Sequence, residues 1–496
     1  MNMTRTWPTW GKAAGLSLLA VLPCFWHPRL QAADLATHTY GVWLAQLIEQ
    51  GQAPGLKLVS QTSNILFDWL LNSAVHRFGF GRGPQVAVAV CVLLLFWGSF
   101  RFVSQFSKNQ PWFLVSSLLI LCYGWTLHYG LMNFYLGLGL VIWGMALCWE
   151  QSPWWKMAAG LGLIALSLAA HPLPAAWGAG LLAYSWAVRW LGQSRWWWVM
   201  TAAIAAIAGL RFYLVSHYRT FWRPPPVPLL PADQAWVFGT KYYAITVLLE
   251  IFWVFILWRL AYVGGFGSVL RSVPFQMFVI TIVFVWIFPD AILLPAYAAP
   301  LSFITERMTL PAGILLCLVM AQADALPWQR IGLHAVALLF FVSLWSDSRA
   351  LNHLAQRMES SMAVLPPRQR VVCSISDDRI RIGSTLKSMC DQACIGRCFS
   401  YSFYEPSSHA FRIRPTGPSP VVVTDHDELS MLEEGGFVVR PENLPIYQMS
   451  LCDRAGKPLD EASPKDAEFC LLPLSAGQVI KRVSVVGATP LLWSVR

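Results

Sequence analysis

The sequence predicts an all-helical integral membrane domain with about eleven transmembrane helices, followed by a small exported domain of mixed α/β structure. Of the 496 residues, 56% are hydrophobic and only 12% are charged, which is about half the charged share of a typical soluble domain. The mean hydropathy is +0.49. Tryptophans gather at the ends of apolar runs, as at Trp154–Trp155 and Trp196–Trp198, where an indole ring suits the headgroup layer. Together these features exclude an ordinary soluble globule.

The first apolar run, residues 13–26, follows Arg5 and Lys12. Basic residues beside short loops remain in the cytoplasm, so we expect the N-terminus inside and the next loop outside. The same run could instead be a cleaved signal peptide, because Gln31–Ala33 is an acceptable cleavage context. In both cases the large loop that follows, residues 29–84, is exported.

Ten further apolar runs are long enough to span a bilayer. They lie at about residues 86–102, 112–128, 130–149, 155–171, 173–190, 196–214, 242–260, 274–289, 308–324 and 331–346. Every connection expected on the inner side carries Lys or Arg, in agreement with the positive-inside rule. An odd number of spans places the C-terminus outside. The short pairs that meet at His128–Tyr129 and at His171–Pro172 could instead be re-entrant.

These runs divide the chain into a multi-pass membrane domain, a connecting segment and an exported domain. We expect the boundaries at residues 1–346, 347–365 and 366–496. In the last part, strand-like runs such as Val421–Val423 and Val483–Val486 alternate with turn-rich stretches. This alternation predicts a small mixed α/β fold.

Six of the eleven cysteines fall in the exported part, and they are Cys373, Cys390, Cys394, Cys398, Cys452 and Cys470. An even number of cysteines in an oxidising compartment predicts up to three disulfides, without specifying their pairing. On a helix, Cys390, Cys394 and Cys398 would form one stripe that could ligate a soft metal. No nearby histidine completes a usual ligand spacing, so disulfides are the preferred interpretation.

The exported loop opens with Asp34-Leu-Ala-Thr-His38 and continues through Asn64 and Asp68. A helix that begins at Asp34 would carry His38 one turn later on the same side. The sequence therefore predicts an acid and an imidazole together where the first span leaves the lipid. The alternative for Asp34 is an N-cap, which stabilises a helix without chemistry. The alternative for Asp68 is a solvated helix face.

One span, a large outer loop that opens with an acid, and many further spans are typical of polytopic sugar transferases. Asp34, His38, Asn64 and Asp68 match this arrangement most directly, and the stretches His128–Phe134 and Thr305–Met308 match it less directly. Over residues 1–346 the chain resembles the GT-C superfamily of membrane glycosyltransferases, which includes protein mannosyltransferases and lipid A aminoarabinose transferases. It departs from the mannosyltransferases at Leu35, since their Asp-Glu pair is absent. The exported tail matches no named family.

The resemblance implies an inverting transferase that moves a sugar from a polyprenyl-phosphate-linked donor to an extracytoplasmic glycan, lipid or protein. In those families an acid of the first outer loop is the base, which here is Asp34. His38 would orient Asp34 or bind substrate, and Asn64 and Asp68 would bind substrate. A divalent cation, Mg²⁺ or Mn²⁺, held by Asp34 or Asp68, is left open.

The departing phosphate needs positive charge beside it. Arg211 lies near the outer end of one apolar run, and Arg307 lies at the outer start of another. Ionisable groups in spans are functional hypotheses by default, although both arginines could instead extend to lipid headgroups. Glu306, next to Arg307, is either an ion-pair partner or a second acidic group of the site.

We therefore expect a glycosyltransferase of the bacterial inner membrane, whose partners are membrane lipids, the lipid-linked donor and an exported acceptor. The net charge of +10 is interpreted as topology and interface anchoring, and no basic patch with interleaved aromatics indicates nucleic-acid binding. The rival class is a non-catalytic membrane protein, either a transporter or a lipid- or glycan-binding scaffold for envelope assembly. A transporter should show repeated halves, and no clear internal repeat is visible.

Overall fold

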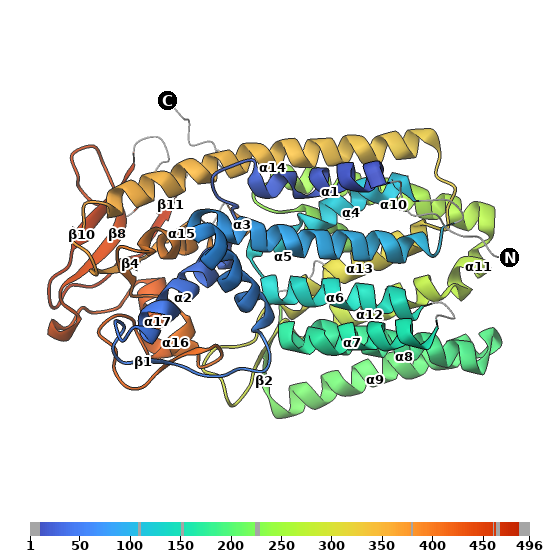
Figure 1. Ribbon diagram of the computed structural model, residues 1–496, viewed down its shortest axis with the longest axis horizontal. Helices are drawn as coiled ribbons and strands as arrows, with labels where there is room; N and C mark the ends of the chain where they lie inside the picture. Colours follow the sequence, from blue (N-terminus) through green and yellow to red (C-terminus); the bar gives the residue numbers. More distant parts are fainter. Residues whose placement is uncertain are drawn as a thin grey trace.

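The computed structural model is mostly helical and has a small strand-containing C-terminal part (Figure 1). It describes residues 10–107, 111–149, 153–223, 229–377, 380–459, 461–462 and 467–485. Arg5 and Val486, which the sequence analysis used, lie outside these ranges. Within them, five helical stretches are long and apolar enough to cross a membrane: Leu66–Ser104, Trp112–Tyr129, Trp196–His217, Lys241–Gly264 and Pro327–Met362.

Each of the predicted apolar runs contains a helix, and the helices lie side by side in one bundle (Figure 1). They are α1 (Trp10–Phe25), α3 (Leu66–Ser104), α4 (Val115–Cys122) with α5 (Trp125–Tyr129), α6 (Met132–Cys148), α7 (Trp154–Ala170), α8 (Pro172–Leu191), α9 (Trp196–His217), α10 (Lys241–Gly264), α12 (Val273–Ile287), α13 (Ile304–Met320) and α14 (Pro327–Met362). A short helix, α11 (Phe266–Arg271), follows α10. That all eleven runs cross the membrane stays a prediction, since α1, α6, α7 and α12 have 17 residues or fewer.

Helix α3 joins the exported loop to the bundle in one element. The loop helix that carries Asp68 continues into the predicted span, with a sharp break at Gly79. Gly79 has a φ of 73°, a left-handed conformation that glycine adopts at little cost. After the break the chain turns back and packs closely against the preceding turns of the helix. A Cβ on Gly83 would lie only 2.7 Å from the Val75 Cα. This reversal sets Asp68 at the mouth of the bundle.

Helix α14 connects the bundle to the C-terminal part without interruption. Its 36 residues extend over roughly 54 Å at 1.5 Å per residue, well beyond a hydrocarbon layer of about 30 Å. The segment predicted as a connection, residues 347–365, is therefore helical as far as Met362. A continuous helix makes this junction stiff.

The C-terminal part contains two small sheets and three short helices. One sheet has the order β10-β8-β4-β6, with strands Glu468–Pro473, Ile446–Cys452, Arg370–Cys373 and Phe399–Ser400. The other has the order β5-β11-β9, with strands Ile375–Ser376, Val483–Val485 and Glu461–Ala462. The helices are α15 (Thr385–Cys394), α16 (Glu405–Ser408) and α17 (His426–Glu434). Strands were predicted in this part, and it contains them. The prediction of a strand at Val421–Val423 is wrong, because these buried valines have no regular secondary structure.

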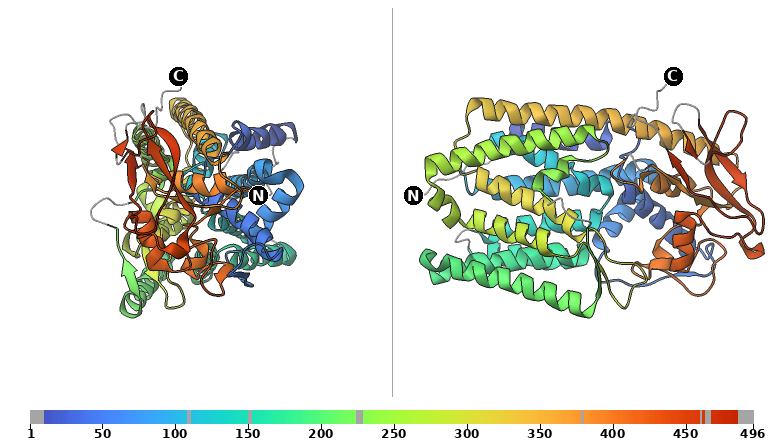
Figure 2. Two further views of the ribbon diagram at one scale, coloured as in Figure 1. Left: turned by 90° about the vertical axis from the view of Figure 1, so that its left-hand side faces the viewer. Right: turned by 180° about the vertical axis from the view of Figure 1, so that it is seen from behind.

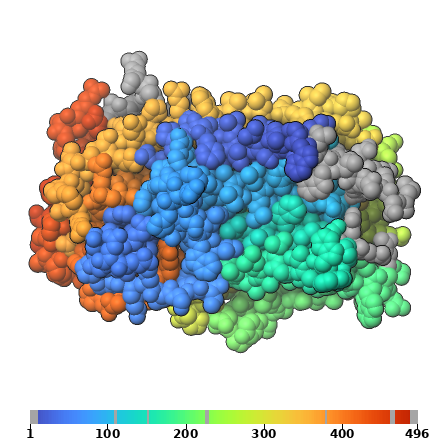
Figure 3. Space-filling model, in the orientation of Figure 1, coloured from blue at the N-terminus to red at the C-terminus, as the bar shows by residue number. Residues whose placement is uncertain are grey.

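The exported loop and the C-terminal part share structure at one end of the molecule (Figures 2 and 3). Strand β1 (Leu56–Leu58) of the loop pairs antiparallel with β7 (Ile413–Pro415). Helix α2 (Ala33–Glu49) packs against α15, where Thr37 Oγ1 donates to Asp391 Oδ2 at 3.0 Å. These long-range contacts join the two regions, both predicted to lie outside the membrane, into a single body, which we call the exported body after that prediction.

The structure pairs four of the six exported cysteines. Cys394 bonds Cys398, and Cys452 bonds Cys470. Cys373 and Cys390 are buried free thiols. The helical stripe considered as a metal site does not form, because α15 ends at Cys394 and the chain turns at Gly396, whose φ is 78°.

Candidate functional site

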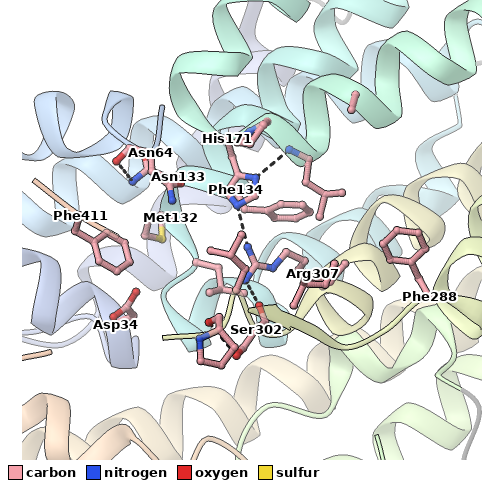
Figure 4. Close-up of a pocket in the computed structure, with 18 of the residues that line it drawn as sticks. Asp34, Asn64, Met132, Asn133, Phe134, His171, Phe288, Ser302, Arg307 and Phe411 are labelled. Carbon is pink, nitrogen blue, oxygen red and sulfur yellow. Dashed lines mark hydrogen bonds between the residues drawn. The ribbon is translucent and has the colours of Figure 1, made fainter. Parts of the chain in front are cut away.

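A cavity of about 580 Å³ lies where the bundle meets the exported body (Figure 4). Its ionisable lining residues are Asp34, His38, His171 and Arg307, and its other polar lining residues are Asn64, Asn133 and Ser302. We call the side with Asp34 and His38 the acidic wall and the side with His171 and Arg307 the cationic wall (Figure 4). Most of the remaining lining is apolar and includes Leu131, Met132, Phe134, Leu173, Leu214, Phe288, Ile292, Leu301, Ile304 and Phe411. The cavity thus combines a few polar groups with a largely hydrocarbon surface, as ligand sites commonly do.

The acidic wall is built on the first turns of α2. His38 Nε2 lies 3.4 Å from Asp34 Oδ2, and His38 Nδ1 lies 3.0 Å from Asp68 Oδ1. The imidazole is therefore held between two carboxylates. Both residues line the cavity, but the side chain of Asp34 is 22% exposed and that of His38 only 6%, so Asp34 is the more accessible of the two.

The charge of His38 follows from these neighbours. Burial by itself lowers the pKa of the imidazole, but Asp68 and then Asp34 outweigh it and hold the pKa well above its ordinary value. The two carboxylates thus favour the protonated ring, in which both nitrogens donate. It fixes the orientation of Asp34 through a charge-assisted contact.

Asp34 does not cap its helix. The N-cap position is Ala32, which makes no side-chain capping bond, and Asp34 is the second helical residue. Its Oδ1 instead accepts a hydrogen bond from the Tyr404 hydroxyl at 3.1 Å. Gly130 permits this packing, because a Cβ there would lie 2.6 Å from the Asp34 backbone nitrogen. The N-cap interpretation is wrong.

Asp68 supports the acidic wall through its contact with His38 and does not itself line the cavity. It is buried, with 7% of the residue exposed, so the solvated-face interpretation is also wrong. Asn133 Nδ2 lies 3.4 Å from Asp68 Oδ2 and 3.3 Å from the Asn64 carbonyl oxygen, while its Oδ1 accepts from the Phe67 backbone N–H. Asn64 itself lines the cavity, whereas Asp68 acts through His38.

The cationic wall is fixed by backbone carbonyls at the start of α13. Arg307 Nε donates to Phe303 O at 2.9 Å, and Nη2 donates to Ser302 O at 2.5 Å. Its third contact is Nη1, which lies 3.0 Å from His171 Nε2 (Figure 4). The guanidinium is thus held in place at the edge of the cavity.

His171 caps a helix and also lines the cavity. Its Nδ1 accepts from the Leu173 backbone N–H at 3.1 Å at the start of α8. The Nη1–H of Arg307, which can only donate, is directed at Nε2 of the same ring. The ring therefore orients the guanidinium at the edge of the cavity.

Two predicted site residues are placed elsewhere. Arg211 lies on an exposed face of α9, with its guanidinium 5.1 Å from the Trp222 ring. Glu306 is buried but forms its ion pair with Arg223 instead of Arg307. Consecutive residues on a helix point about 100° apart and do not face each other, so Arg307 can line the cavity while Glu306 does not.

The exported body contributes two residues that the sequence analysis missed, Tyr404 and Glu405 at the start of α16. Tyr404 donates to Asp34, as described. Glu405 is 5% exposed and packs against α2, where a Cβ on Gly41 would lie 3.2 Å from Glu405 Oε1. Burial raises the pKa of Glu405 to about 7, and nearby Asp68 adds to the rise. The only sequence signal was their place in an aromatic and polar run.

The carboxylates do not fit the divalent cation that was left open. Asp34 and Asp68 lie on opposite nitrogens of His38 and do not converge. Among the described residues, no group of three or more His, Cys, Asp or Glu side chains is arranged to hold a metal ion. The imidazolium between them would also repel a cation.

A scan against protein-family models found no match, and searches of curated proteins and of solved structures found no similar protein. What the cavity can bind and do follows from its own chemistry. The acidic wall can accept a proton, the cationic wall can bind an oxyanion, and the apolar lining can hold a hydrocarbon chain.

Proposed function

We propose that the protein is a membrane glycosyltransferase of the GT-C type, which moves a sugar from a polyprenyl-phosphate-linked donor to an exported acceptor with inversion. The observation that carries the proposal is that Asp34 and the Arg307–His171 pair line one cavity, with Asp34 on one side and the pair on the other in Figure 4. In an inverting displacement the attacking oxygen and the leaving phosphate lie on opposite faces of the sugar. The catalytic base and the phosphate-binding site are therefore needed on opposite sides of the sugar.

In this mechanism Asp34 takes the proton from the acceptor hydroxyl as its oxygen attacks the anomeric carbon. The bond from that carbon to the phosphate oxygen breaks, and the electron pair leaves with polyprenyl phosphate. Arg307, oriented by His171, stabilises the charge that develops on the phosphate. His38, held by Asp68, keeps Asp34 oriented, and Tyr404 donates to the other oxygen of Asp34.

The surroundings suit a lipid-linked donor. The apolar lining offers hydrocarbon contacts from α6, α8, α9 and α12, for example Phe134, Leu173, Leu214 and Phe288. We include in the proposal that all eleven apolar runs span the bacterial inner membrane, with the N-terminus in the cytoplasm and the C-terminal part outside. The acceptor would then reach Asp34 from the exported side.

The test is sugar transfer by the purified protein in lipid nanodiscs, using a panel of polyprenyl-phosphate sugars and a cell-envelope extract as the acceptor source. We expect wild type to release polyprenyl phosphate and Asp34→Asn to lose that activity by about a thousandfold. Asp324→Asn is the matched control, because this carboxylate is 87% exposed and does not line the cavity. Equal transfer by Asp34→Asn would contradict the proposal, and donor binding without turnover by wild type would favour a scaffold.

A further inference from the structure

A second cavity, of about 520 Å³, lies between the end of α1 and the outer half of α14. The two helices run along one edge of the molecule (Figure 3). Trp345, Arg349 and His353 follow one another at intervals of four residues on α14 and line this groove, so they share one helix face. His27 and Arg29 form the facing side. The groove shares no lining residue with the cavity that contains Asp34.

Hydrogen bonds hold the two sides of the groove together. Asn352 Oδ1 accepts from the Arg29 backbone N–H, and Asn352 Nδ2 donates to the Arg29 carbonyl, both at 2.9 Å. His27 Nε2 lies 2.9 Å from the Trp345 carbonyl oxygen. The groove is therefore preformed, which lowers the entropic cost of binding a ligand.

The groove carries an excess of positive charge. Glu359 is its one carboxylate, and this residue is already paired with Arg29. Arg349 has no carboxylate partner among the described residues, and its guanidinium lies 5.8 Å from the Trp345 ring. Burial lowers the pKa of His27, the hydrogen bond to the Trp345 carbonyl opposes this, and the positive charge of Arg349 lowers the pKa further. An anion in the groove would relieve this repulsion.

An apolar stripe leads along α14 to the groove. Leu338, Val342 and Trp345 lie on the same helix face as Arg349 and are 66%, 57% and 43% exposed. Such a row of exposed apolar side chains suits acyl chains, and a tryptophan at its end marks the level of the headgroups. The stripe changes from apolar to cationic at the position where a lipid changes from hydrocarbon to phosphate.

We propose that this groove binds the phosphodiester headgroup of an anionic phospholipid. Arg349 and His353 contact the phosphate, Trp345 lies at the glycerol level, and the acyl chains follow Leu338 and Val342. A soluble phosphate would use the cationic groove but would gain nothing from the apolar stripe. This site does not depend on the proposed transferase activity, since its readout is lipid binding.

The experiment measures binding to the purified full-length protein in detergent, by native mass spectrometry and by thermal stability. The added ligands are phosphatidylglycerol, phosphatidylcholine and inorganic phosphate. We expect phosphatidylglycerol to bind and to raise the melting temperature of wild type, and the double variant Arg349→Gln/His353→Gln to bind it at least about tenfold more weakly. Arg349→Lys keeps the charge and should keep most of the binding.

The control is Arg219→Gln, which removes an exposed charge of the exported side that does not line the groove. This variant should bind phosphatidylglycerol like wild type. Equal binding by wild type and the double variant would overturn the site. Equal protection by inorganic phosphate would overturn the assignment to a lipid. If the double variant does not fold, the single variant Arg349→Gln and its Lys counterpart decide the question.

Discussion

The acidic wall and the cationic wall of the main cavity are held together by different kinds of contact. On the acidic wall, Asp34, His38 and Asp68 are bonded to one another and to neighbouring side chains, so their positions are set by the protein. On the cationic wall, Arg307 donates to the carbonyls of Phe303 and Ser302 and contacts His171 Nε2. The first wall therefore holds one carboxylate in place, whereas the second holds one guanidinium at the edge of the cavity.

After removal of the Asp34 carboxylate, removal of the Arg307 guanidinium should have the largest effect. We expect Arg307→Gln to lower kcat for sugar transfer by about a hundredfold, because negative charge on the phosphate increases in the transition state. The effect on KM for the donor should be smaller. The measurement is steady-state kinetics in nanodiscs. Arg211→Gln is the control, since this arginine is exposed and lies outside the cavity; a similar loss in both variants would contradict the assignment.

A smaller effect should follow from loosening the acidic wall. Tyr404→Phe removes one hydrogen bond to Asp34 and should reduce kcat by about tenfold, with donor KM nearly unchanged. Tyr401→Phe is a matched control, because Tyr401 is buried in the same exported body and bonds Asn443 instead. Unchanged kcat in Tyr404→Phe would show that Asp34 needs no support from the exported body.

The smallest effect concerns stability and its dependence on pH. Glu405 has a folded pKa of about 7, raised from 4.5 mainly by burial. The folded state therefore binds this proton more tightly than the unfolded state, so stability is greatest below about pH 4.5 and falls as pH rises through 7. Glu405→Gln should remove this loss and raise the free energy of unfolding at pH 8 by roughly 1–3 kcal/mol.

Thermal unfolding of the purified protein at pH 5 and pH 8 measures this effect. The variant should resemble wild type at pH 5 and exceed it at pH 8. Glu434→Gln, which changes an exposed carboxylate, should behave like wild type at both values. A destabilised Glu405→Gln at pH 8 would mean that the ionised carboxylate has a favourable partner, such as Arg412.

The sequence was sufficient for features that depend on neighbouring residues. Runs of apolar side chains predicted the positions of the helices, because such runs favour helix wherever the backbone leaves water. The contact of Asp34 with His38 followed from a spacing of four residues on one helix. The helical course of 347–362 was missed, since polar residues replace the apolar run there while the helix continues against the exported body.

The tertiary structure alone decided which distant groups meet. Tyr404 reaches Asp34 across 370 residues, and Arg307 reaches His171 across 136. Neither pair leaves a local pattern, because each depends on how the bundle and the exported body pack. The pairing of the cysteines and the ion pair between Glu306 and Arg223 also depend on tertiary packing and leave no local pattern. Sequence determined which chemical groups lie beside the apolar runs, and only packing determined which of them share a cavity, since that depends on the path of the whole chain.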